Sequence, residues 1–258
     1  MQPAETLLSA TGISKRFGGL TALSEVSISV RRGEIFGLIG PNGAGKTTLF
    51  NVLTGLYAAD AGELVFDGWP FAGSKPHQVA QHGIARTFQN IRLFGGMTAL
   101  ENVMVGRHVR TRTGVLGAVL RTHGAAIEER AITQRARELL DYCGLAARAG
   151  DLARDLPYGD QRRLEIARAL ATDPKLLALD EPAAGMNATE TGTLRKLLER
   201  TVADGTTLLL IEHDMKLVMG LSHRVAVLDY GEKIAEGEPA VVQRDPKVIA
   251  AYLGGTLA

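Results

Sequence analysis

The chain has 258 residues, of which 45% are hydrophobic and 22% charged, and its formal net charge at pH 7 is +1. This composition is ordinary for a globular domain, and the near-neutral charge argues against a broad electrostatic affinity for nucleic acid. Cys143 is the only cysteine, which excludes an internal disulfide and favours the cytosol. No apolar run approaches the roughly 18 residues that a membrane-spanning helix needs.

The N-terminal segment is expected to be β-structure. Residues 7–30 have strand character, and residues 26–30 alternate apolar and polar side chains as a half-buried strand does. Such strands suggest a small antiparallel layer. Phe17 lies in this layer, and its ring either stacks on the base of a bound ligand or packs as a partly buried core aromatic.

Residues 35–53 read as a strand, a glycine-rich loop and a helix, in that order. The loop fits G-x-x-x-x-G-K-[ST], the phosphate-binding pattern. Its residues are Gly40, Pro41, Asn42, Gly43, Ala44, Gly45, Lys46, Thr47 and Thr48. Glycines let backbone N–H groups surround an anion, and the helix N-terminus adds a partial positive charge.

Two side chains of this loop carry specific chemistry. Lys46 can reach the β- and γ-phosphates of a nucleotide, and the hydroxyl of Thr47 can bind Mg²⁺. The alternative is a glycine-rich turn that happens to precede a lysine. The strand before the loop and the helix after it favour phosphate binding, because the motif requires that context.

The central region changes from strands to helices. Ser74 is a candidate N-cap of a helix that ends near Gly83, and residues 84–89 read as a strand ending at Gln89. The side-chain carbonyl of Gln89 could reach Mg²⁺ or water. Residues 98–101 have the capping-box form T-x-x-E, and residues 125–142 have helical spacing. Within a single domain of residues 1–258, we therefore expect an all-helical subdomain over 90–160, between the core segments 1–89 and 161–258.

Strands and helices alternate again in the C-terminal part. Residues 176–179, 207–211 and 225–228 read as buried strands, and residues 193–202 read as a helix. The sum predicts an α/β fold of the P-loop NTPase class. Its mostly parallel sheet would carry helices on both faces, an antiparallel β layer and the inserted helical subdomain.

Acidic residues and a histidine follow two of these strands. Asp180 and Glu181 come directly after an apolar strand, and two adjacent carboxylates need a cation or a proton to be tolerable. Asp180 would hold Mg²⁺, and Glu181 would orient or deprotonate the attacking water; the alternative is a simple turn before Pro182. His213 follows another strand, at the edge where ligands bind, although a lone histidine is more often structural.

A second candidate anion site precedes the helical residues 164–170. Free N–H groups at the start of that helix could bind a phosphate, or the helix could simply be capped without a ligand. Because the chain has only one lysine-bearing loop, this second site hints at the nucleotide of another molecule. Its residues are Leu156, Pro157, Tyr158, Gly159, Asp160 and Gln161.

Together, these residues resemble the ATP-binding subunits of ABC transporters over essentially the whole chain. In that family, Gln89 matches the Q-loop, residues 156–161 match the signature motif loosely, and His213 matches the switch histidine. Phe17 occupies the adenine-stacking position. The D-loop position is filled by Gly185, Met186 and Asn187. Residues 85–94, 158–167 and 237–254 are more closely similar to the branched-chain amino-acid importers, and to the ATPase with the longer helical insertion.

The resemblance implies an ATP-hydrolysing subunit with ATP and Mg²⁺ as its cofactors and Lys46, Glu181 and His213 as catalytic residues. It implies a head-to-tail dimer with a second ABC ATPase, two membrane-spanning permease subunits, a substrate-binding protein and a peripheral place on the cytoplasmic face of the membrane. The usual signature sequence is Leu-Ser-Gly-Gly-Gln, and here Pro157 replaces its serine and Asp160 its glutamine. Proline lacks both the hydroxyl of serine and a backbone N–H.

Two other functions are alternatives for a chain with this phosphate-binding loop. A soluble ABC ATPase acting on nucleic acid or ribosomes should show a basic tract or paired ATPase domains, and the sequence has neither. A regulatory module that holds ATP without turnover should lack the base, yet Glu181 is present. The transported solute is expected to be a branched-chain amino acid or a similar small polar molecule.

Overall fold

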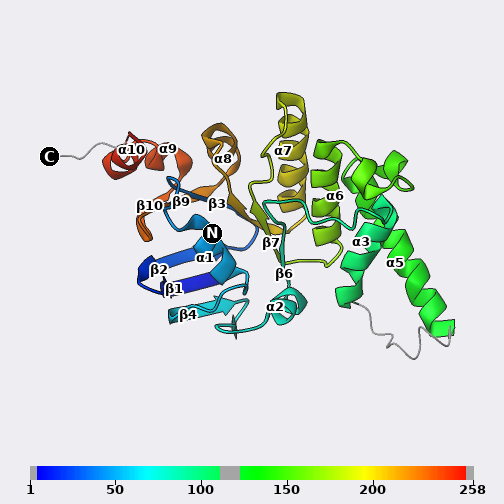
Figure 1. The fold of residues 1–258 in the computed structure, drawn as a ribbon, viewed down its shortest axis with the longest axis horizontal. Helices are drawn as coiled ribbons and strands as arrows, with labels where there is room; N and C mark the ends of the chain where they lie inside the picture. The colour runs from blue at the N-terminus through cyan, green and yellow to red at the C-terminus, as the bar shows by residue number, and fades with distance from the viewer. Residues whose placement is uncertain (1–4, 111–122, 254–258) are drawn as a thin grey trace.

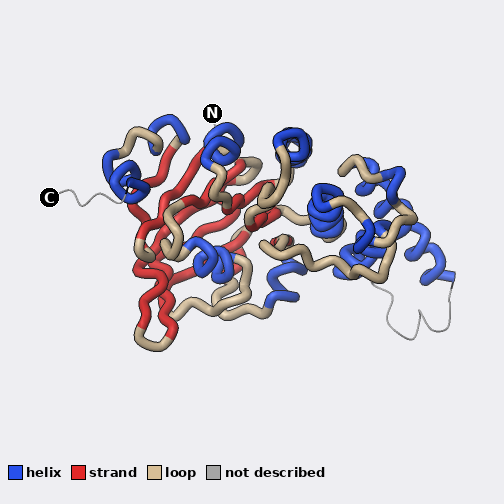
Figure 2. Tube along the Cα trace, turned by 45° about the horizontal axis from the view of Figure 1, so that its top comes forward, coloured by secondary structure: helices blue, strands red, loops and turns tan. Residues whose placement is uncertain are grey.

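The computed structural model describes residues 5–110 and 123–253, and its strands form two sheets (Figures 1 and 2). The smaller sheet has the strand order β2-β1-β4-β5, and all of its pairings are antiparallel. This confirms the antiparallel layer expected at the N-terminus. Its strands are β1 (Thr6–Phe17), β2 (Leu20–Arg31), β4 (Ala61–Phe66) and β5 (Trp69–Pro70).

The larger sheet has the strand order β10-β9-β3-β8-β7-β6. Every pairing in it is parallel except that of β9 with β10. The predicted α/β fold with a mostly parallel sheet is therefore confirmed. Its strands are β3 (Ile35–Ile39), β6 (Ile84–Arg86), β7 (Leu176–Asp180), β8 (Thr207–Ile211), β9 (Arg224–Asp229) and β10 (Glu232–Gly237).

Both faces of this sheet are covered, so its central strands are runs of mostly apolar residues that are buried at every position rather than at alternate ones. In β7, Leu177 and Leu179 pack into a core shared with helices α6, α7 and α8. Leu176 and Ala178 point the other way, into a core shared with α1 and the antiparallel sheet. This alternation follows from the two-residue period of a strand.

The helices lie around the two sheets (Figure 1). They are α1 (Lys46–Leu53), α2 (Pro76–His82), α3 (Ala99–Arg107), α5 (His123–Tyr142), α6 (Tyr158–Leu170), α7 (Ala188–Ala203), α8 (Met215–Leu221), α9 (Pro239–Val242) and α10 (Pro246–Leu253). Among the described residues, no helix combines the length and the apolar character that crossing a membrane requires.

Helices α3, α5 and α6 pack together at the end of the molecule away from β1 and β2 (Figure 1). The capping box expected at the start of α3 is confirmed: Thr98 Oγ1 accepts from the Glu101 N–H at 3.2 Å, and the Glu101 carboxylate accepts from the Thr98 N–H at 2.7 Å. Residues 111–122, in the part of the sequence with the weakest pattern, lie outside the described residues. The division of the chain at residues 90 and 160 stays a prediction.

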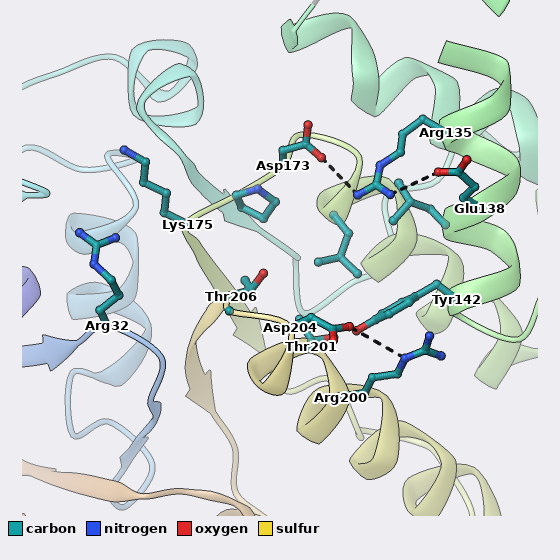
Figure 3. Close-up of a pocket in the computed structure, with 14 residues that line it drawn as sticks. Arg32, Arg135, Glu138, Tyr142, Asp173, Lys175, Arg200, Thr201, Asp204 and Thr206 are labelled. Atoms are coloured by element: carbon teal, nitrogen blue, oxygen red, sulfur yellow. Dashed lines mark hydrogen bonds and ion pairs between the residues drawn. The ribbon is translucent and has the colours of Figure 1, made fainter. Parts of the chain in front are cut away.

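A pocket of about 580 Å³ lies between α5, the C-terminal end of α7 and the residues just before β7 (Figure 3). Tyr142 of α5 spans part of it and donates its hydroxyl to Asp204 Oδ2 at 2.8 Å. The guanidinium of Arg200 lies 4.1 Å from the centre of the Tyr142 ring, and Arg135 pairs with Asp173 at 3.4 Å. These polar contacts connect the helical end of the molecule to the sheet on the side where the parallel strands begin.

Two local expectations in the central region were wrong. Ser74 does not cap α2, because Lys75 holds the N-cap position and Pro76 begins the helix. Proline suits the first turn, where its missing N–H costs no hydrogen bond. Strand β6 ends at Arg86, so Gln89 lies in the loop beyond it rather than at the strand end. Only three residues of this edge strand pair with β7, which limits its length.

Two helices begin earlier than expected. Helix α6 begins at Tyr158, so Gly159, Asp160 and Gln161 lie inside its first turn rather than before it. Helix α7 begins at Ala188, because Asn187 accepts from the N–H groups of Thr189 and Glu190 in a capping box. An asparagine three residues before a glutamate was the signal for this start.

Cys143 is buried, so its thiol should be protected from reagents in the folded protein. The side chain follows α5, is 3% exposed, and has its pKa raised by burial to about 12. Because the thiolate is the reactive form, we expect Ellman's reagent at pH 8 to label the native protein only at the rate of unfolding. Labelling should become fast and stoichiometric in guanidinium chloride. Fast labelling of the native protein would contradict this packing of α5.

Candidate functional site

Polar residues follow three neighbouring parallel strands and meet at one edge of the larger sheet. The loop after β3 contains Lys46, β7 ends at Asp180, and β8 is followed by Glu212 and His213. Because β3, β8 and β7 are adjacent and parallel, their carboxyl ends lie side by side. Ligands bind at this edge in open parallel sheets.

The glycine-rich loop is shaped by close backbone contacts. A Cβ on Gly40 would lie 2.1 Å from the Leu228 carbonyl oxygen, and a Cβ on Gly45 would lie 2.7 Å from that of Ala22. Both glycines also have positive φ angles, of 152° and 96°. Another residue type at either position would have to move the neighbouring backbone, so the two glycines let the loop pack closely against β9 and β2.

Lys46 stands at the first position of α1, and its ammonium is held over its own loop. Nζ donates to the carbonyls of Gly40 at 2.7 Å and Pro41 at 2.8 Å. Burial lowers the pKa of Lys46, and the negative charge of Glu181 partly opposes that shift. The side chain is thus positioned at the mouth of the loop, with Glu181 as the carboxylate that faces it.

Asp180 is a buried carboxylate, 5% exposed, at the end of β7. Burial raises its pKa, the nearby Arg86 guanidinium lowers it, and the adjacent Glu181 raises it. The neighbouring Glu181 is more exposed than Asp180, and its backbone has a positive φ of 47°. Such backbone strain in a residue other than glycine is typical of functional sites.

Glu181 contacts two side chains that lie far from it in the sequence. Gln89 donates its amide Nε2 to Glu181 Oε2 at 3.0 Å, and His213 Nδ1 lies 3.7 Å from the same oxygen. The loop after β6 therefore brings Gln89 to Glu181, a contact that the sequence did not predict. Gln89, Glu181 and His213 form one cluster at the sheet edge, with the carboxylate at its centre.

The oxygen atoms of Thr47, Gln89 and Asp180 suit Mg²⁺, which prefers oxygen ligands and usually binds through one or two carboxylates together with substrate phosphates. No group of three or more histidine, cysteine, aspartate or glutamate residues forms a metal cage in the described ranges. One carboxylate with one hydroxyl and one amide oxygen is a donor set that fits a cation shared with a nucleotide.

Comparison with known proteins supports the same interpretation of these motifs. The family model described as "ABC transporter" matches residues 23–184, and the one described as "Branched-chain amino acid ATP-binding cassette transporter" matches residues 232–258. The "High-affinity branched-chain amino acid transport ATP-binding protein LivG" of Escherichia coli is 46% identical over 252 residues, which are 97% of this chain and 99% of that one. The chain belongs to the ABC transporter family.

Other relatives agree. BraF of Pseudomonas aeruginosa, with the same descriptive name, is 44% identical over 96% of this chain and 98% of its own. A crystal structure of an ABC transporter cassette in its ADP conformation superposes with a TM-score of 0.84 at 34% identity, covering 97% of this chain and 99% of that one. A dimeric bacterial ABC transporter cassette superposes with a TM-score of 0.77 at 25% identity, covering 90% of this chain and 99% of that one. This chain is thus an ATP-binding subunit with ATPase activity.

Phe17 is the last residue of β1 and is exposed on the surface of the ABC subunit. Its ring is 44% exposed and meets Tyr57 edge-to-face at a centroid distance of 5.4 Å. Lys15 Nζ lies 5.5 Å from the centre of the same ring. The exposure leaves room for a further aromatic ring, which favours base stacking over the alternative of a core aromatic.

The ABC signature segment lies apart from the phosphate loop. Its helix α6 is on the far side of β7 and β6 from α1 (Figure 1). Pro157 is the N-cap residue of α6 without a side-chain cap, and Gln161 donates to the Leu156 carbonyl at 2.8 Å. The structure therefore does not bring the signature residues together with Lys46 in one chain.

The D-loop residues lie beside the signature segment instead. Gly185 has a positive φ of 77°, and a Cβ there would lie 3.1 Å from Tyr158 Cε1. Met186 packs at the edge of the core, and Asn187 caps α7. Asp160, the departure from the usual glutamine, pairs with Arg163 at 2.6 Å, so its charge is offset within the chain.

One residue of the site was missed by sequence reasoning. Glu212 is 1% exposed, and its carboxylate accepts from the N–H groups of Ala183 at 2.8 Å, His213 at 3.1 Å and Asp214 at 3.4 Å. It thereby joins the loop after Glu181 to the loop that carries His213. Burial raises its pKa, and these N–H groups lower it. An acidic residue directly after the apolar residues 208–211 was the available signal.

Proposed function

We propose that this ABC transporter subunit binds ATP with Mg²⁺ at the edge of its parallel sheet and hydrolyses it to drive uptake of branched-chain amino acids or similar small polar solutes. The observation that carries the proposal is the convergence of Gln89 and His213 on Glu181, beside Lys46 and Asp180. The names of its relatives, as branched-chain amino acid transport ATP-binding proteins, support the solute class.

The residues of the site divide the reaction between them. Backbone N–H groups of residues 42–48 and the ammonium of Lys46 bind the phosphates, and the exposed ring of Phe17 stacks on adenine. Thr47, Asp180 and Gln89 hold Mg²⁺, which neutralises phosphate charge when bound. Glu181 accepts the proton of the attacking water, and Gln89 and His213 keep its carboxylate in place.

The assembly follows from the position of the signature segment. Because residues 156–161 cannot reach the phosphates held by their own chain, we propose that they bind those of a second, related ABC ATPase in a head-to-tail dimer. Solved cassettes of similar fold are described as dimeric, and one of them as bound to ADP and Pi. The N–H groups at the start of α6 would serve the nucleotide even though Pro157 lacks a hydroxyl.

The partners in the membrane are two permease subunits, which receive substrate from a binding protein, and the ABC subunit lies at their cytoplasmic face. A groove of about 370 Å³ between α2, α3 and α6 fits a helix of a permease. Phe94, 48% exposed, and Val109, 38% exposed, line it. Of the nearby apolar residues Ile91, Leu93, Phe94 and Met97, Phe94 lines this groove, whereas Leu93 packs against the core.

A soluble ABC ATPase acting on nucleic acid or ribosomes is the alternative. The net charge of +1 does not favour it, and the named relatives are transport proteins. We therefore propose that no nucleic acid binds.

The first test concerns the base. Glu181→Gln removes the proton acceptor and keeps the shape of the side chain, so steady-state ATP hydrolysis should fall at least about 100-fold while ATP affinity is retained. Glu199→Gln, an exposed change on α7, is the matched control and should hydrolyse ATP normally. Normal turnover by the Glu181 variant would refute the assignment.

A second test concerns the permease groove. Cysteines introduced by Phe94→Cys and Val109→Cys should crosslink to a membrane-spanning subunit in the assembled transporter, and the buried Cys143 should not compete. Val241→Cys, 65% exposed on α9 at the other end of the molecule, is the control. Crosslinks from residue 241 alone would contradict this docking face.

A further inference from the structure

Arg162 is a buried arginine of α6 that none of the roles above uses. Its side chain is 4% exposed, and it lies on the first turns of the helix that begins with the signature segment. A buried guanidinium is costly unless its donors are satisfied. Each of its three nitrogen atoms has an acceptor within the protein. This complete use of a rigid, planar donor group indicates a specific positioning role.

The acceptors of Arg162 belong to two separate segments. Nη1 donates to the Phe88 carbonyl at 2.9 Å, and Nη2 donates to the Gln89 carbonyl. On the other side, Nε and Nη2 donate to the Tyr158 hydroxyl at 3.1 and 2.9 Å. One side chain therefore holds the main chain of Gln89 and the signature residue Tyr158 together.

Glu165, on the next turn of α6, adds further contacts between this helix and the segment around Gln89. Glu165 is 2% exposed, pairs with Arg162 at 3.5 Å, and accepts from the N–H groups of Phe88 at 3.5 Å and Arg92 at 3.4 Å. Both the N–H and the C=O of Phe88 are thus bound by α6. The segment around Gln89 cannot shift relative to α6 without breaking several buried charge-assisted contacts, which are the stronger class of hydrogen bond.

Tyr158 is suited to sense a contact on the surface. Its ring is 43% exposed at the start of α6 and touches the D-loop at Gly185, while its hydroxyl is bound to Arg162. At the other end of the series, the Gln89 side chain donates to the Glu181 carboxylate at 3.0 Å. Hydrogen bonds thus join Tyr158 to Arg162 and Arg162 to the main-chain carbonyl of Gln89. The side chain of the same Gln89 binds Glu181, so this residue links the signature segment to the catalytic carboxylate.

We propose that Arg162 is a positioning residue through which the signature residue Tyr158 controls the orientation of Glu181 in the same chain. This inference rests on the proposed function, in which the signature segment meets the nucleotide of a second ATPase. Contact at Tyr158 then moves Gln89 through Arg162, and Gln89 aligns Glu181 at the chain's own nucleotide. Hydrolysis at one site depends in this way on occupancy of the other.

The test uses Tyr158→Phe, which removes the hydroxyl and keeps the exposed ring, in the complete transporter with its partner ATPase. We expect kcat to fall about tenfold and the Hill coefficient for ATP to fall towards one. The ATP affinity of the isolated subunit should stay unchanged. ATP-driven association, measured in the Glu181→Gln background, should also stay unchanged, which separates misalignment of Glu181 from a failure to dimerise.

Two further variants keep the test independent of folding. Arg162→Lys retains the charge but cannot bridge Tyr158 and Gln89, so it should reproduce the Tyr158→Phe defect at a similar melting temperature. Arg195→Lys makes the same change at an exposed arginine of α7 that pairs with Glu199, and it should behave as wild type.

The inference is overturned if Tyr158→Phe and Arg162→Lys keep wild-type kcat and cooperativity, or if kcat falls only in proportion to lost association. A wild-type complex that hydrolyses ATP without cooperativity would also overturn it. Failure of the proposed function would look different, because the wild-type complex itself would then show no turnover that depends on Glu181.

Discussion

Parallel pairing of β3, β8 and β7 is the constraint on which the site depends. Each strand is buried on both faces, so its register is set by two cores at once, and a shift of one residue would move apolar side chains to the wrong core. Because these strands end at the same edge, the phosphate loop, the Asp180–Glu181 pair and the Glu212–His213 pair meet there although they are separated in sequence. The site is therefore a consequence of how the sheet is packed.

The same edge concentrates negative charge that the protein only partly offsets. Burial raises the pKa of both Asp180 and Glu212, and Arg86 acts against this shift at Asp180. Arg86 itself is fixed by Asn51 and Thr54 at 3.0 and 2.8 Å, behind the phosphate loop. A cation shared with a nucleotide would relieve the remaining repulsion, since opposite charge favours the ionised carboxylates. The carboxylates of the site therefore favour binding of a cation together with the nucleotide.

The sequence predicted those parts of the site whose signal is local. The phosphate loop and the Asp180–Glu181 pair carry their chemistry within a few residues of a recognisable strand, so both were found. Glu212 and Arg162 were missed, because their partners are distant: Ala183 lies 29 residues from Glu212, and the Gln89 carbonyl lies 73 residues from Arg162. The predicted end of β6 was wrong for a related reason, since the strand ends where its pairing with β7 stops. The start of α7 differs, because the local capping signal of Asn187 and Glu190 was present in the sequence.

The most direct measurement of the central claim is the affinity of the purified chain for ATP with and without the ammonium of Lys46. A hydrogen bond to a charged group contributes about 1.5–3 kcal/mol, so Lys46→Ala should weaken ATP binding by roughly 10- to 100-fold. Lys196→Ala, an exposed change on α7, should bind ATP as the wild type does. An affinity of the Lys46 variant within about twofold of wild type, below any effect expected for a charge-assisted bond, would contradict the account of the sheet edge as a phosphate-binding site.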